Sequence, residues 1–197
     1  SGALSGHVHS FASAAELKSH VAKNLSPARP KIIIIGANGR VGSGATDFCT
    51  SLGATLTCWD TKETAHGGPY PEILAHDIFL NCILANQDTP IFVPASAKTA
   101  ARKLMVIGDI ACDPDSAYSP VKVYNRSTTW QESTLRVHKS PILDVTAIDN
   151  LPSILPRDSS EDFAAQLLPS LLSLQDIKSG VWGKARCIFD QHIAALN

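Results

Sequence analysis

The stretch that decides the fold runs from Lys31 to Gly42 and reads KIIIIGANGRVG. Four consecutive isoleucines favour a strand that is covered on both faces, as the strands of a parallel sheet are. Three glycines follow at the spacing GxxGxxG, and a helical pattern then runs from about Val41 to Leu52 and ends at Gly53. A strand, a glycine-rich turn and a helix in this order predict the start of a nucleotide-binding βαβ unit.

The segments around this stretch continue the alternation of strands and helices. On its N-terminal side, a capping box at Ser13 and Glu16 predicts a helix through about Asn24. On its C-terminal side, we predict strands at 55–59, 77–84 and 104–108, a loop at 61–71 and a short helix at 95–103. This order predicts an α/β fold, a doubly wound parallel sheet of Rossmann type with right-handed crossovers.

The last third of the chain has a weaker pattern. We expect a loop at 109–120, short edge strands within 121–136 and a strand at 142–145. A cap at Ser159 and Ser160 predicts a helix with a kink or break at Pro169. Its apolar face consists of Phe163, Leu167, Leu168, Leu171 and Leu172, and a final amphipathic helix is predicted at 181–196.

Gly36, Gly39 and Gly42 predict a binding turn for a dinucleotide pyrophosphate. Backbone N–H groups at a helix N-terminus bind phosphate, and glycines leave room for its approach. Asn38 occupies the place of the second glycine of the common GxGxxG motif, so a Rossmann-like sheet without a ligand is the alternative. Arg40 is either a phosphate ligand or a surface residue.

Asp60 ends the second strand, 24 residues after Gly36. A carboxylate at this place accepts hydrogen bonds from the adenosine ribose and repels a 2′-phosphate. Asp60 therefore predicts NAD as the cofactor in preference to NADP. The alternative is that Asp60 only caps the end of the strand.

The composition excludes several classes of protein. The 197 residues are 44% hydrophobic and 18% charged, which is a globular balance, and the net charge is −1. Without a basic excess we expect no nucleic-acid partner, and without a long apolar run we expect no membrane partner. We therefore expect the partner of this protein to be a small-molecule substrate.

The five cysteines predict a reducing compartment. Their number is odd and none forms a CxxC pair, so we expect free thiols, with Cys49, Cys58, Cys82 and Cys187 buried and Cys112 in a loop. We predict a cytoplasmic protein, with an organelle such as the peroxisome as the alternative. No metal site is predicted, because the single H-x-H pair, His7 and His9, lies near a ragged end.

Several longer strings resemble the NAD-dependent, lysine-forming saccharopine dehydrogenases. They occur in one order from about Lys31 to the C-terminus: IIGANGRVGSGA (34–45), WDTKET (59–64), GGP (67–69), DIFLNCI (77–83), DIACD (109–113), IDNLPSILPR (148–157), SE (160–161) and LPSL (168–171). The resemblance implies an enzyme that interconverts saccharopine, NAD and water with L-lysine, 2-oxoglutarate and NADH. It also implies a monomer.

The resemblance also implies roles for individual residues. Gly39 and Arg40 are expected at the pyrophosphate, Asp60 at the ribose, and Thr64 on the adenosine side. The whole cofactor set is Gly36, Gly39, Arg40, Val41, Asp60, Thr64, Leu84, Ile110, Ile148, Asp149, Asn150 and Leu151, the last four at the nicotinamide end. Ala111, Cys112 and Asp113 are expected to border the saccharopine site, although relatives often have Ser at the place of Ala111.

The resemblance implies a division of the chain and a missing part. Residues 1–30 are expected to form a connecting segment that includes a helix. Residues 31–155 are expected to form the NAD-binding domain, and residues 156–197 to form helices that return to a first domain. That domain carries the catalytic Lys and His of the family, so we expect a fragment without catalytic residues of its own and without activity alone. The absence of an initiator Met before Ser1 agrees with a fragment.

Two other interpretations remain open on the sequence. The chain could be a non-catalytic dinucleotide-sensing or assembly module that has lost its partner domain. It could also belong to another amino-acid dehydrogenase with the same sheet, against which the string from Ile148 to Arg157 argues.

Overall fold

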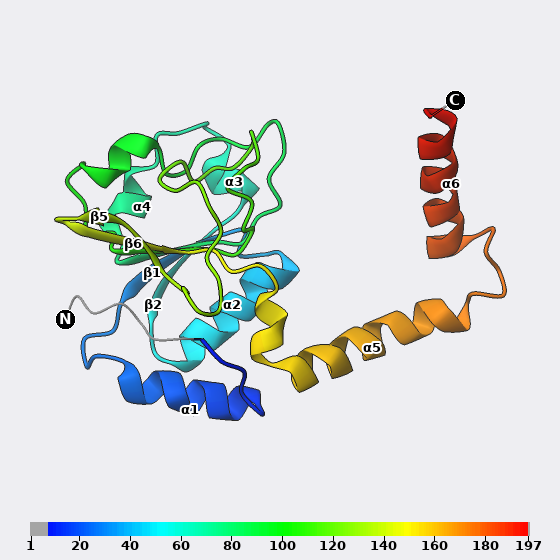
Figure 1. Ribbon diagram of the computed structural model, residues 1–197, viewed down its shortest axis with the longest axis horizontal. Helices are drawn as coiled ribbons and strands as arrows, with labels where there is room; N and C mark the ends of the chain where they lie inside the picture. The colour runs from blue at the N-terminus through cyan, green and yellow to red at the C-terminus, as the bar shows by residue number, and fades with distance from the viewer. Residues whose placement is uncertain (1–7, 197) are drawn as a thin grey trace.

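The computed structural model describes residues 8–196, which form a six-stranded sheet with helices on both faces (Figure 1). His7 of the H-x-H pair lies outside these residues. The strands are β1 (Lys31–Ile35), β2 (Thr55–Trp59), β3 (Ile78–Asn81), β4 (Val106–Asp109), β5 (Leu135–Lys139) and β6 (Ile142–Thr146). The helices are α1 (Ala14–Asn24), α2 (Arg40–Ser51), α3 (Thr61–Thr64), α4 (Pro71–Ala75), α5 (Pro156–Leu172) and α6 (Gly180–Ala194), with 3₁₀ turns η1 (Ala95–Lys98) and η2 (Leu151–Ile154).

The strand order is β2-β1-β3-β4-β6-β5, and every pair is parallel except β5 with β6. The chain runs from β1 to β2 on one side and then crosses to β3 on the other side of β1. This reversal is the point where doubly wound sheets bind their ligands, at the carboxyl ends of the strands. The predicted α/β fold is confirmed.

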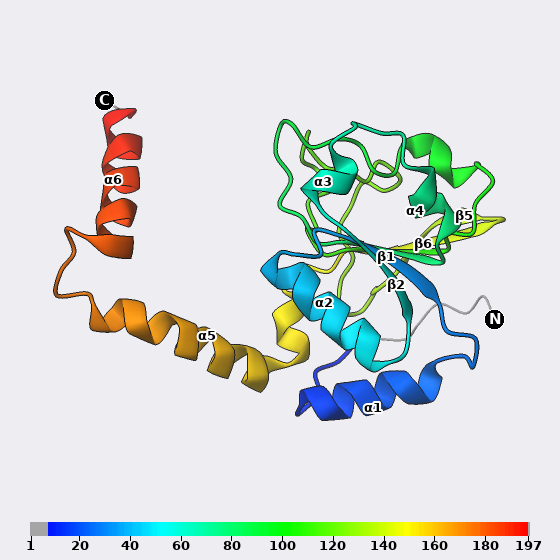
Figure 2. The same cartoon turned by 180° about the vertical axis from the view of Figure 1, so that it is seen from behind.

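The isoleucines of β1 divide between the two faces of the sheet. Ile32 and Ile34 pack with Ala45 and Cys49 of α2, whereas Ile33 and Ile35 belong to the larger core on the opposite face. Both views place α1 and α2 on one face and α3, α4 and η1 on the other (Figures 1 and 2). Because side chains alternate along a strand, a run of four apolar residues needs both of these layers.

A short helix, α3, occupies the start of the predicted loop at 61–71, and a second one, α4, begins at its last residue. Asp60 and Glu63 form a capping box that starts α3, and Pro71 begins α4. Both are local signals that favour a helical turn. Elsewhere the predicted elements are shorter: the strand at 77–84 ends at Asn81, because its neighbours end at Ile35 and Asp109 in the same register, and the helix at 95–103 is only η1.

The C-terminal helices also differ from the prediction. α5 begins at Pro156, which stands at its first position, and not at Ser159 or Ser160. The helix continues through Pro169, so the predicted break does not occur. Within α5 and α6 as described, no residue is buried, and the two helices extend away from the sheet (Figures 1 and 2).

Exposed apolar side chains are frequent on this C-terminal arm, defined as residues 156–196. Phe163, Leu172 and Phe189 are each more than half exposed, and Val181 and Ile188 are exposed as well. The indole of Trp182 donates a hydrogen bond to the Ser170 carbonyl over 2.7 Å and so joins α6 to α5. Within residues 8–196, no helix combines the length and the apolar character that a membrane span requires.

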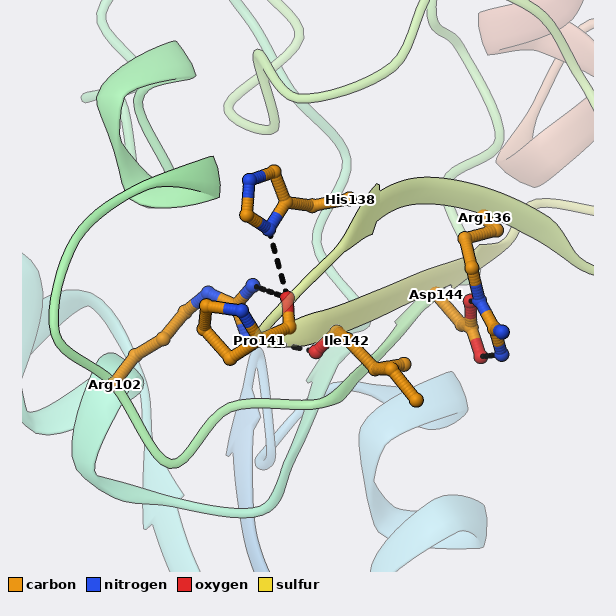
Figure 3. A network of polar contacts seen from close by, with 6 residues as sticks. All are labelled: Arg102, Arg136, His138, Pro141, Ile142 and Asp144. Atoms are coloured by element: carbon orange, nitrogen blue, oxygen red, sulfur yellow. Dashed lines mark hydrogen bonds and ion pairs between the residues drawn. The ribbon is translucent and has the colours of Figure 1, made fainter. Parts of the chain in front are cut away.

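Arg102 stabilises the turn that leads into β6 by hydrogen bonds to the backbone (Figure 3). Within the described part of the chain, its guanidinium donates hydrogen bonds to the carbonyl oxygens of five residues, Ala97, Lys98, Leu104, Pro141 and Ile142. The Pro141 carbonyl also accepts from His138 Nδ1 over 2.8 Å. One side chain thus joins η1, the approach to β4 and the start of β6.

Candidate functional site

The glycine turn between β1 and α2 is closely packed. Gly36 has φ +86°, and a Cβ there would lie 2.9 Å from the backbone of Cys82. A Cβ on Gly42 would lie 2.0 Å from the Gly36 carbonyl oxygen. These two positions therefore require glycine, for the left-handed backbone and for the close approach of α2 to the turn.

The N-terminus of α2 opens at this turn. Gly39 is the N-cap and has no side chain to accept from the first N–H groups of the helix. Such groups have no acceptor within the helix and carry its positive dipole end. The turn therefore fits an anionic group of a ligand, and Arg40, the first helical residue, adds a cation beside it.

Asp60 is tied to the glycine turn and to α3 at once. One carboxylate oxygen accepts from the Asn38 N–H over 3.0 Å, and the other accepts from the Thr61 N–H over 2.8 Å. In return, the Asp60 N–H donates a hydrogen bond to the Glu63 carboxylate over 2.9 Å. Asp60 is thus the N-cap of α3, whereas the alternative interpretation held that it only caps the end of the strand. Each oxygen keeps a second lone pair, so the ribose contact stays a prediction.

A cavity of about 370 Å³ lies beside Asp60. Two further residues of the predicted cofactor set, Thr64 and Leu84, line it, and the Leu84 side chain is 95% exposed at its edge. Phe92 closes it on the core side, and Tyr70 holds the segment after α3 by donating to the Thr64 carbonyl over 2.7 Å. Its lining is mainly apolar, with the carboxylates of Asp60 and Asp88 among a few polar groups, and this combination suits a nucleoside.

A second cavity, of about 660 Å³, includes Arg40. Asn150 lines the same cavity, so residues predicted at the pyrophosphate and at the nicotinamide end lie together. Asp162 of α5 also lines it and forms an ion pair with Arg40, with 3.1 Å between the Arg40 Nη2 and Asp162 Oδ2 atoms. Arg40 is a surface residue in this structure, 69% exposed at its side chain, and its phosphate role stays a prediction.

The segment from Ile148 to Leu151 contributes unequally to this region. Ile148 is buried and bridges to Thr128, so its side chain belongs to the core. Asp149 and Asn150 are exposed, and Asn150 has φ +64°, a left-handed conformation that Asn tolerates better than most residues. If this segment contacts the nicotinamide as predicted, the contacts come from its backbone and from the side chains that follow Ile148.

The residues predicted at the saccharopine site follow β4. Cys112 has φ +48°, and its thiol donates to the Ala147 carbonyl over 2.9 Å. Burial raises the pKa of this thiol, the contact with Ser127 partly offsets this, and nearby carboxylates raise the pKa further, which favours the neutral, hydrogen-bond-donating form of Cys112. Ile110 and Ala111 are half-buried and Asp113 is exposed.

A buried polar cluster beneath this segment was missed in the sequence. Asp109 accepts from Asn81 Nδ2 over 2.9 Å and from the Tyr124 hydroxyl over 2.7 Å. Among the described residues, Asn81 Oδ1 is buried without a partner. Burial and the Asp109 carboxylate raise the pKa of Tyr124 far above its usual range. Asn81 and Asp109 each end an apolar run in the sequence, but only the folded sheet shows that they lie opposite each other in the register.

The cysteines correct one expectation. All five are free, but Cys58 and Cys187 are exposed, and Cys49 and Cys82 are half-buried and not buried as expected. Cys58 lies on the edge strand β2, and Cys187 lies on α6, which leaves the body of the protein. Among residues 8–196, no group of three or more His, Cys, Asp or Glu side chains lies close enough together to hold a metal ion.

Several known proteins that are similar to this chain share one name. No protein-family model matches it. The saccharopine dehydrogenase (NAD+, L-lysine-forming) of Candida albicans is 43% identical over 175 residues, which are 85% of this chain and 46% of that protein. The proteins of the same name from Neurospora crassa and Yarrowia lipolytica are 43% and 40% identical, over 85% and 96% of this chain.

These matches confirm the resemblance that the sequence motifs indicated. The chain spans about half the length of the curated relatives it matches, between 46% and 55%. The similarity therefore covers nearly all of this chain and only part of each relative.

Proposed function

We propose that this chain is the NAD-binding portion of an NAD-dependent, lysine-forming saccharopine dehydrogenase. The observation that carries the proposal is the glycine turn at the switch point of the sheet, where Asn38 ties the turn to Asp60 over 3.0 Å. Relatives of that name, 40–43% identical, support the same conclusion. The reaction is the interconversion of saccharopine, NAD and water with L-lysine, 2-oxoglutarate and NADH.

The residues around the turn fit this cofactor. At Gly36 and Gly42 a Cβ would fill the space that the turn needs, which is the arrangement a pyrophosphate cradle requires. Gly39, Arg40 and Val41 would neutralise the pyrophosphate through the helix N-terminus and the guanidinium. Asp60 would accept from the ribose, while Thr64 and Leu84 would border the adenosine in the cavity they line. When bound, NAD supplies the acceptor or donor of a hydride.

The far end of the cofactor would meet the substrate residues. Ile110 and the segment from Ile148 to Leu151 would border the nicotinamide, and Ala111, Cys112 and Asp113 would border saccharopine. The protonated thiol of Cys112 would donate a hydrogen bond, because its raised pKa keeps the proton in place at neutral pH. We assign no general acid or base to this chain.

The remaining features complete the proposal. Five free thiols support a reducing compartment, for which we propose the cytoplasm, and we propose a monomer for the whole enzyme. Residues 31–155 would form the NAD-binding domain, and residues 156–197 would pack on the other half of the enzyme. The exposed Phe163 and Phe189 support this last assignment.

Calorimetric titration of the 197-residue chain tests the proposal. We expect NAD to bind and NADP to bind more weakly, because Asp60 would repel the 2′-phosphate. In a second assay with saccharopine and NAD, we expect no NADH, since no acid–base residue is assigned to this chain. Absence of NAD binding would contradict the cofactor assignment, and steady turnover would contradict the assignment of catalysis to other residues.

A further inference from the structure

We propose that Asp162 competes with the pyrophosphate of NAD for Arg40, and so weakens dinucleotide binding while the arm is held in place. The competition makes Asp162 a determinant of cofactor affinity, although it lies 122 residues away from Arg40 in the sequence. This inference rests on the proposed function, because it presupposes that the glycine turn receives a pyrophosphate.

The ion pair joins the arm to the phosphate-binding end of α2. Arg40 is the first residue of α2 and follows the glycine turn directly. Asp162 lies in the second turn of α5, and its Oδ2 atom is 3.1 Å from Arg40 Nη2. Both views place the start of α5 beside the N-terminal end of α2 (Figures 1 and 2).

Asp162 is held toward Arg40 by its own helix. Gln166 Nε2 donates to the same Asp162 Oδ2 atom over 2.6 Å. The hydrogen bonds from Gln166 and Arg40 hold the pKa of the Asp162 carboxyl below its usual range, so it is an anion at neutral pH. The base of α5 is anchored separately, because Asp158 accepts from the Ala14 N–H over 3.0 Å.

A pyrophosphate at the glycine turn would meet this anion. Arg40 and Asp162 line one cavity of about 660 Å³, and Arg40 follows the glycine turn directly. A phosphate bound at the N-terminus of α2 and the Asp162 carboxylate would therefore be two anions near one guanidinium. Arg40 would then exchange the carboxylate for the phosphate, so the ion pair with Asp162 must be given up on binding and Asp162 opposes it.

The expected size of the effect follows from exposure. The side chains of Arg40 and Asp162 are 69% and 64% exposed, so the pair is weak and readily broken. Exposed pairs of this kind correspond to a change of about 1.5- to 5-fold in an equilibrium constant. Linkage requires the converse as well, so bound cofactor weakens the contact of α5 with α2 by the same factor.

Asp162→Asn is the variant that tests the competition. It keeps the size of the side chain and an acceptor oxygen but removes the charge. Glu161→Gln is the matched control, because it removes the same charge from the next residue, which pairs with Arg157 of its own helix over 2.9 Å. We expect NAD to bind Asp162→Asn about 1.5- to 5-fold more tightly in low salt, and Glu161→Gln to bind it as the wild type does.

A double-mutant cycle and salt separate competition from other effects. In an Arg40→Ala background, the gain from Asp162→Asn should disappear, since there is no guanidinium to compete for. Raising the salt concentration from about 20 mM to 500 mM should reduce the gain toward zero, because both groups are exposed. A purely structural role of Asp162 in α5 would respond to neither change.

Each outcome decides the inference. Equal NAD affinity for wild type and Asp162→Asn, an equal gain in Glu161→Gln, or a gain that persists without Arg40 would overturn it while leaving the NAD site intact. If the wild-type chain binds no NAD, the proposed function fails, and the competition fails with it.

Discussion

Arg102 and Arg40 show two opposite uses of the same side chain. Arg102 sits at the corner before β6 and directs its guanidinium at five carbonyl oxygens of the described chain, those of Pro141 and Ile142 (Figure 3) among them. Arg40 sits at the open end of α2, has a side chain that is 69% exposed, and pairs there with the surface carboxylate of Asp162. A guanidinium whose donors are committed to the backbone holds the fold, whereas an exposed one beside a cavity is available to a ligand.

The surroundings of the two arginines differ in the same way. Near Arg102, Arg136 pairs with Asp144 through two hydrogen bonds of 2.8 and 2.9 Å across the β5–β6 hairpin, and His138 donates to Pro141 (Figure 3). Near Arg40, the glycine turn leaves the first N–H groups of α2 without side-chain partners. Stability is therefore concentrated at the hairpin corner and binding capacity at the carboxyl edge of the sheet, and variants can separate the two.

Arg102→Ala should have the largest effect on stability. It would leave several backbone carbonyls without their donor, and each buried unpaired group costs about 1–3 kcal/mol. We expect the free energy of unfolding in urea to fall by about 3 kcal/mol or more. NAD affinity, measured at low temperature where the variant is folded, should remain within twofold of the wild type.

Arg102→Lys is the control for charge at this corner. An ammonium lacks the planar fork of donors and reaches fewer carbonyls, so we expect it to recover less than half of the lost stability. Full recovery would show that charge and not geometry matters here. A large loss of NAD affinity in folded Arg102→Ala would contradict the division between the two regions.

Gly42→Ala should weaken NAD binding strongly and should lower the free energy of unfolding less than Arg102→Ala does. Its Cβ would lie 2.0 Å from the Gly36 carbonyl oxygen, so α2 must move away from the turn. We expect a loss of about 2–3 kcal/mol in unfolding free energy and at least about a tenfold loss in NAD affinity. Chemical denaturation and calorimetric titration measure the two effects.

Gly44→Ala provides the matched control on the same helix. Among the described atoms, nothing lies within 4 Å of a Cβ at this position. Alanine in a helix interior is more favourable than glycine, so we expect a gain of about 0.5–1 kcal/mol with unchanged NAD affinity. If Gly42→Ala behaved like Gly44→Ala, the close packing of the turn would have no role in binding.

Local sequence signals explain why the central βαβ unit and the glycine turn could be predicted from the sequence. The isoleucines of β1, the glycines after them and Asp60 are close in sequence, and each element follows from its own residues. The order of strands around β1 then places the binding edge. Short helices such as α3 were missed because their capping box lies in a stretch that reads as a loop.

Contacts between distant residues explain why the rest could not be predicted. Arg102 meets Ile142 across 40 residues, Asn81 meets Asp109 across 28, and Arg40 meets Asp162 across 122. No local pattern specifies such partners, since they depend on how finished elements pack. The buried cluster at Asp109 and the hairpin corner are therefore visible only in the folded chain.

Asp60→Ala should have an intermediate effect that links fold and binding. The loss of the α3 cap and of the contact to Asn38 should cost about 1–2 kcal/mol in stability. NAD affinity should fall by about tenfold, and the preference for NAD over NADP should shrink, because the carboxylate no longer repels a 2′-phosphate. Titration of both dinucleotides measures the preference directly.

Asp60→Asn separates the cap from the charge. The amide oxygen can still accept from the Thr61 N–H, but the amide nitrogen cannot accept from the Asn38 N–H, so we expect part of the stability to be retained while discrimination against NADP is lost. Unchanged NAD affinity in Asp60→Ala would show that the carboxylate is only a cap. An unchanged preference for NAD in Asp60→Asn would place the discrimination elsewhere.

The reactivity of the Cys82 thiol tests the packing of the glycine turn in the wild-type protein, without a substitution that lowers its stability. Burial raises the pKa of Cys82 to about 11, with further contributions from Cys49 and Asp109, and its backbone supports Gly36. Only about one Cys82 in a thousand is a thiolate at pH 8, and the thiolate is the reactive form. With an aromatic disulfide reagent at pH 8, we expect the exposed Cys58 and Cys187 to react first and Cys82 to be slow.

The pH dependence and one variant make this test specific to the turn. The Cys82 rate should rise about tenfold for each pH unit above 8, because the thiolate fraction grows until the pH reaches the pKa. In Gly42→Ala, displacement of α2 should expose Cys82 and speed its reaction, while Cys58 and Cys187 react as before. Equal rates of Cys82 in the two proteins would mean that the turn absorbs the new methyl group without opening, and the loss of NAD affinity would then require another cause.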